Sequence, residues 1–128
     1  MKNTILTHKK GFTIFTCIFL VFMGCFSFPI FNFSKEAPNI SKWLNILTAF
    51  LAYYELGLLQ GILYHSKVML KCTFTTFSMT VLGFLCRFLL EYGEISNTYN
   101  FTMPNILFHL LISICIVTFG VFYSPQNN

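Results

Sequence analysis

Three ionisable side chains lie inside long apolar stretches of the chain and are the residues best suited to chemistry: Glu55, Arg87 and His109. A charged side chain at the centre of a bilayer costs roughly 2.5 to 3.5 kcal/mol, so each of them needs a partner, nearby water or, for the carboxyl group, a bound proton. A carboxylate at this depth binds protons or cations. The planar guanidinium of Arg87 suits a carboxylate or an anionic ligand.

Two arrangements of these residues fit the sequence. In the first, Glu55, Arg87 and His109 form a polar cluster or ligand-binding site in the outer half of the membrane, with Glu91 as the more exposed partner of Arg87. Side chains tilt toward the N-terminus of their own helix, so Glu55 and Arg87 lean toward each other from antiparallel helices. In the second, Arg87 pairs with Glu91 and lipid headgroups, while Glu55 stays protonated and hydrogen-bonded.

Patterns typical of other sites are lacking in the sequence. No two histidines stand at a metal-binding spacing, and the five cysteines include no Cys-x-x-Cys pair. The 8 basic residues and 4 acidic residues are too few and too scattered for a nucleic-acid surface. We therefore expect no metal, no cofactor, no nucleic-acid partner and no catalytic residue, and an enzyme is less favoured than a binding or structural protein.

The composition places these residues in a membrane protein. Of 128 residues, 55% are hydrophobic and only 9% are charged, whereas soluble domains have about 25% charged residues. A chain of this length has too small an interior to bury so much apolar surface, so the remainder must face the lipid bilayer. The mean hydropathy of +0.69 also excludes a disordered chain.

Four stretches are long enough to cross a hydrocarbon core of about 30 Å, which requires roughly 20 apolar residues per helix. Their length and their lack of alternating polarity exclude barrel strands. The sequence therefore predicts one all-α membrane domain over residues 1–128, a four-helix bundle. We expect the first stretch to be a retained span, because it exceeds the 7 to 15 apolar residues of a signal peptide. The stretches run over about 11–31, 42–64, 72–90 and 104–123.

Helix boundaries and orientation follow from single residues. Asn39 or Ser41 is suited to cap the second helix, and Pro104 is favoured in the first turn of the fourth. We expect the chain to lie in the cell membrane. Most of its lysines fall on one side of that membrane, which by the positive-inside rule puts both termini on the cytoplasmic side. The lysines on this side are Lys2, Lys9, Lys10, Lys67 and Lys71, against Lys35 and Lys42 on the other.

Small residues predict where the helices pack. Gly57 and Gly61 form a small-xxx-small pair in the second span, which serves internal packing or a homodimer. Thr76, Thr80 and Gly83 share a face of the third span. The phenylalanines of the first span share one side and are expected to face lipid; they are Phe12, Phe15, Phe19, Phe22 and Phe26.

Residues 55–120 resemble the small four-span DoxX-like membrane proteins. The resemblance rests on Glu55-Leu-Gly57, on Gly83-x-x-x-Arg87 followed by Gly93, and on a polar residue in the fourth span, where His109 stands in place of an expected acid. It implies a four-helix bundle and, in some members, association with quinone or sulfur redox complexes. We expect an accessory or interaction subunit of a membrane complex; the alternative is a small proton- or cation-coupled transporter that uses Glu55 as its buried carboxylate.

The lysine distribution generates a test of the orientation. In a cysteine-free variant, Ser96→Cys should react with an impermeant thiol reagent added outside intact cells, because its loop faces outward. Ser66→Cys should stay unlabelled because it lies on the cytoplasmic side. The reverse labelling pattern would contradict the predicted orientation.

Overall fold

The computed structural model describes residues 1–30, 39–64 and 66–125. Four of its helices are long and apolar enough to cross a membrane, which confirms the predicted all-α class and the four spans. The helices are α1 (Lys2–Thr7), α2 (Lys9–Phe26), α3 (Ile40–Leu63), α4 (Val68–Leu90), α5 (Ile95–Asn100) and α6 (Met103–Tyr123). By length and composition, α2, α3, α4 and α6 are the spans.

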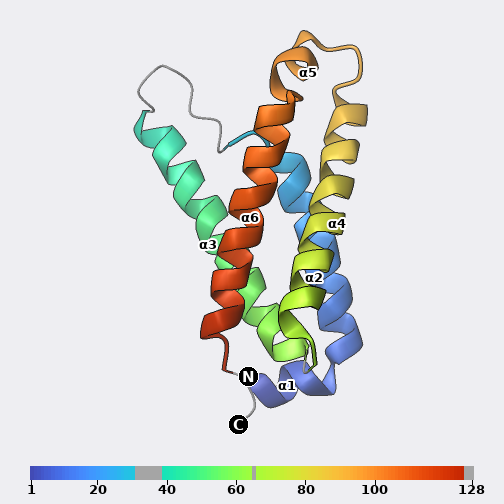
Figure 1. Ribbon diagram of the computed structural model, residues 1–128, viewed down its shortest axis with the longest axis vertical. Helices are drawn as coiled ribbons and strands as arrows, with labels where there is room; N and C mark the ends of the chain where they lie inside the picture. Colours follow the sequence, from blue (N-terminus) through green and yellow to red (C-terminus); the bar gives the residue numbers. More distant parts are fainter. Residues whose placement is uncertain (31–38, 65, 126–128) are drawn as a thin grey trace.

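The four spans form an up-and-down bundle in which α2 and α4 run in one direction and α3 and α6 in the other (Figure 1). The short helix α1 lies across one end of the bundle and α5 covers part of the opposite end (Figure 1). We call these the α1 end and the α5 end. The N-terminus and the last turn of α6 lie at the α1 end.

Local sequence explains several helix boundaries. The Asn39 side chain accepts a hydrogen bond from the backbone N–H of Lys42 at 2.8 Å, so the cap predicted for the second span is present. Pro104 stands in the first turn of α6, as predicted. The helix α2 ends at Phe26, about five residues before the predicted end, because Pro29 lacks a backbone N–H and restricts the residue before it. The short helices α1 and α5 were not predicted.

Glycines bring two pairs of parallel helices into backbone contact. The closest-packed pairs are α2 with α4 and α3 with α6. A Cβ atom added to Gly83 would lie 2.8 Å from the Cα of Gly24, and one added to Gly57 would lie 2.9 Å from the Cα of Gly120. Any larger side chain at these positions would push the two backbones apart.

The two pairs are built alike. Gly24 and Gly83 each follow the first residue of their helix by 15 residues, and Gly57 and Gly120 each follow theirs by 17. The half made of α2 and α3 and the half made of α4 and α6 therefore share one up-and-down arrangement, with equivalent helices in contact.

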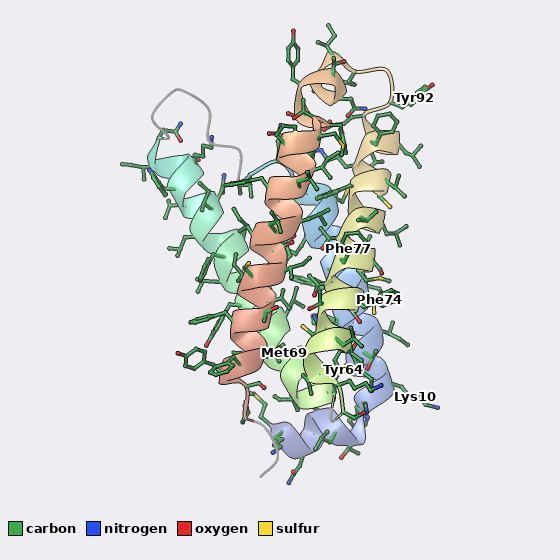
Figure 2. All side chains as sticks on the ribbon, viewed as in Figure 1. Lys10, Tyr64, Met69, Phe74, Phe77 and Tyr92 are labelled. Atoms are coloured by element: carbon green, nitrogen blue, oxygen red, sulfur yellow. The ribbon has the colours of Figure 1, made fainter. Side chains whose placement is uncertain are left out.

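Polar and small residues share the interior with large apolar side chains such as Leu20 and Leu56, while further bulky apolar side chains cover the outside. Thr76 and Thr80 are fully buried, and the Gln60 side-chain N–H donates to the Thr76 hydroxyl at 3.4 Å. Phe74 and Phe77 of α4 are exposed (Figure 2). On α2 the phenylalanines predicted to face lipid divide between two environments. Phe15, Phe22 and Phe26 are exposed, whereas Phe12 and Phe19 pack in part against buried residues.

The glycine contacts generate a stability test with a matched control. Gly83→Ala and Gly120→Ala should each lower the free energy of unfolding by about 1 to 3 kcal/mol, because the added methyl group overpacks a backbone contact. Gly11→Ala is the control, since nothing lies within 4 Å of its Cβ position; it should be neutral or stabilising by up to about 1 kcal/mol, as alanine favours helix. Unfolding in mild detergent, followed by circular dichroism, measures all three, and equal effects would contradict the packing.

Candidate functional site

Arg87 joins the end of α2 to α4 near the α5 end. One terminal nitrogen of its guanidinium donates to the carbonyl oxygens of Phe28 at 2.8 Å and Cys25 at 3.2 Å. The other forms an ion pair with Glu91 at 2.8 Å, one helical turn further along. Carbonyls at a helix C-terminus lack partners within their own helix, so Arg87 satisfies the end of α2 and fixes it against α4.

His109 of α6 pairs with a residue that the sequence analysis did not single out, Tyr53 of α3. The Tyr53 hydroxyl lies 3.1 Å from the imidazole Nε2, and both side chains are almost fully buried. The rings of Phe28 and Phe84 meet the imidazole edge-on, with centroids 5.6 and 5.2 Å away. One sequence signal pointed to Tyr53: a tyrosine in the middle of a span needs a hydrogen-bond partner for its hydroxyl.

Glu55 lies apart from these contacts, on the outside of the bundle. It is exposed and lines a groove of about 240 Å³ between α2 and α3. The other lining residues are Phe15 and Phe19 of α2 and Ala52, Leu56 and Leu59 of α3. The groove therefore combines one carboxyl group with apolar and aromatic walls.

The predicted cluster of Glu55, Arg87 and His109 is divided in the structure. Glu55 lies 15 residues from Ile40, whereas Arg87 lies three residues from Leu90, and both of these helix ends are at the α5 end. At 1.5 Å per residue, the two differ in depth by roughly 18 Å. The predicted pairing of Glu55 with Arg87 is thus corrected, and Glu55 lies nearer the α1 end of α3 than the α5 end, which was predicted to be the outer one. The ion pair between Arg87 and Glu91 is the one that the structure contains.

The direction of Glu55 follows from its spacing to Gly57. Successive helical residues are about 100° apart, so two residues turn the side chain by roughly 200°. Since Gly57 faces α6 in the backbone contact, Glu55 must face away from α6. Counting residues along the sequence does not give this direction.

The contacts of Arg87 generate a second stability test. Arg87→Leu should cost about 1 to 3 kcal/mol, because it leaves the carbonyls of Cys25 and Phe28 without a donor. Glu91→Gln should cost at most about 1 kcal/mol, as expected for a partly exposed ion pair. Unfolding in mild detergent gives both values.

The same measurement tests the separation of the two sites. The effects of Arg87→Leu and Glu55→Gln should add to within about 0.5 kcal/mol, because the residues are far apart. A larger departure from additivity in the free energy of unfolding would contradict this separation and indicate that Glu55 and Arg87 interact directly.

No family model matches the chain, and neither does a curated protein or a solved structure. The resemblance of residues 55–120 to the DoxX-like proteins stays a prediction from the sequence. The roles considered for Glu55, Arg87 and His109 rest on their positions and contacts in the fold.

Proposed function

We propose that this membrane protein is an interaction subunit that binds another membrane protein through the groove between α2 and α3. The observation that carries this proposal is the outward position of Glu55. A carboxyl group that faces acyl chains costs roughly 2.5 to 3.5 kcal/mol. A partner that covers Glu55 with hydrogen-bond donors or an opposite charge removes this cost, which lipid tails cannot do.

The carboxyl group of Glu55 is poorly placed to reach the headgroups by itself. Glu55 lies eight residues from Leu63, or about 12 Å from the α1 end of α3. Helical side chains tilt toward the N-terminus of their helix, and the N-terminus of α3 is at the α5 end. The side chain therefore leans toward the middle of the bilayer, away from the nearer surface, and a protein partner is favoured over headgroup contact.

The other polar groups considered for a site have structural partners within the bundle. Arg87 is held by Glu91 and by the carbonyl oxygens of Cys25 in α2 and of Phe28 just after it. His109 is held by Tyr53 and enclosed by aromatic rings. These contacts explain why each residue is present without a ligand, and they leave Glu55 as the residue through which an outside partner is recognised.

A small proton- or cation-coupled transporter is the second candidate, favoured by the same open carboxyl group. Glu55 would then bind the transported cation, and a second copy would be needed because four helices enclose little space. An interaction subunit requires only the outer surface on which Glu55 lies. The resemblance to DoxX-like proteins supports it as well, because it implies association with larger complexes.

Site-specific photocrosslinking tests the proposal. A photoreactive side chain in place of Leu59, which lines the groove, should crosslink to one partner protein in the native membrane. The same group in place of Leu111, which is 62% exposed on α6, is the matched control and should not capture that partner. Glu55→Gln should abolish the crosslink from position 59, because it removes the charge that the partner covers.

Two results would contradict the interaction subunit. The first is crosslinking of position 59 to lipid alone. The second is proton or cation flux into liposomes that contain only this chain and that stops in Glu55→Gln, which would favour the transporter.

A further inference from the structure

We infer that the groove between α2 and α3 receives a basic side chain, a lysine or arginine, from a transmembrane helix of the partner. This inference rests on the proposed function and specifies the chemistry of its partner. It is carried by the two walls of the groove, which supply two kinds of attraction for one cation.

The two walls come from different helices and differ in chemistry. The wall from α3 carries the carboxyl group of Glu55, and the wall from α2 carries the rings of Phe15 and Phe19. These two rings lie next to each other, with their centroids 5.6 Å apart and their planes 23° apart, so the wall from α2 is aromatic over both residues. Aromatic faces attract ammonium and guanidinium groups, and a carboxylate pairs with them directly. Both attractions are stronger in the low dielectric of a membrane than in water.

The size of the groove favours one side chain over a separate ligand. Its volume of about 240 Å³ is below the roughly 300 to 1,000 Å³ of most small-molecule pockets. Ala52, Leu56 and Leu59 supply the apolar surface along which the stem of a lysine or arginine packs. The partner helix would lie over the groove and insert a single side chain.

The sequence argues against a second copy of this chain as the source of the cation. Every lysine and the one arginine lie outside the spans or within four residues of an end of a spanning helix. None of them stands at the depth of Glu55, eight residues from the end of α3. A symmetric contact between two copies through this groove would bring two Glu55 carboxylates together, and like charges repel. The cation must therefore come from a different protein.

A designed peptide tests the inference without knowledge of the natural partner. The probe is a leucine- and alanine-rich transmembrane peptide with one lysine placed at the depth of Glu55; the control peptide has leucine at that position. Energy transfer between labelled peptide and full-length chain in phosphatidylcholine vesicles measures binding. The lysine peptide should bind about tenfold more tightly than the leucine peptide, as expected for one desolvated charge pair.

Variants of the chain identify the groups responsible. Glu55→Gln should remove the preference for lysine, while Glu94→Gln, which changes an exposed acid beyond the spans, should keep it. Phe19→Leu should weaken the preference without abolishing it. Glu55→Lys should reverse it, so that a peptide with glutamate at the same position now binds best. Since Glu55 is exposed, its variants should keep the helical content of the wild type; circular dichroism checks this for them and for Phe19→Leu, whose side chain packs in part against the core.

The failure of this inference differs from the failure of the proposed function. Equal binding of the lysine and leucine peptides to the wild-type chain overturns the inference that the groove receives a basic side chain, even where crosslinking from position 59 still captures a partner. Energy transfer between copies of the chain that depends on Glu55 would overturn it in favour of a homodimer. Absence of a protein crosslink from position 59 in the chain that keeps Glu55, in contrast, contradicts the proposed interaction subunit itself.

Discussion

Backbone contact between glycines is the constraint on which this bundle depends. Gly24 against Gly83 and Gly57 against Gly120 bring parallel helices together along their small faces. These contacts fix the rotation of each helix about its axis, and this rotation sets the direction of the other side chains on the helix. Gly57 turned toward α6 sends Glu55 to the outside, and Gly83 turned toward α2 places Arg87, four residues later on the same face, beside the end of α2. The position of the candidate site is thus a consequence of helix packing.

The polar residues are sorted by whether the bundle itself satisfies them. Toward the α5 end, Arg87 donates to carbonyl oxygens in the last turn of α2 and just after it, and His109 meets the hydroxyl of Tyr53. Toward the α1 end, Gln60 donates to Thr76 across the interior. Glu55 alone among these residues faces outward into an apolar groove. These inner polar side chains thus find partners within the bundle, whereas Glu55 lies on its outside.

Much of the fold could be predicted because length and composition are properties of single segments. The four spans, the cap at Asn39 and the proline at the start of α6 each depend on a few neighbouring residues. Helix pairing could not be predicted in this way, since α2 packs best against α4 and α3 against α6, and neither pair is adjacent in sequence. Small residues indicated which faces pack, but not which helix each face meets.

For the candidate site, too, one property could be predicted from single segments and another could not: the depth of a residue and the direction of its side chain. Depth comes from counting residues, and it gave the correct neighbourhood for Arg87 and Glu91. Direction depends on the partner of each helix, so the sequence joined Glu55 to Arg87 although they lie on separate faces and at different depths. Tyr53 was missed because a tyrosine in an apolar span has many possible partners, and Tyr54 stands directly beside it. Only the packing of α3 on α6 shows that its partner is His109.

The parallel pairing also sets an order on biosynthesis. The ribosome delivers α2 and α3 first, yet the closest neighbour of each is a helix that is made later. The small face of α2 stays open until α4 enters the bilayer, and that of α3 until α6 does. During this interval α2 and α3 expose small faces that other helices could contact, so correct folding requires these faces to stay free until α4 and α6 arrive.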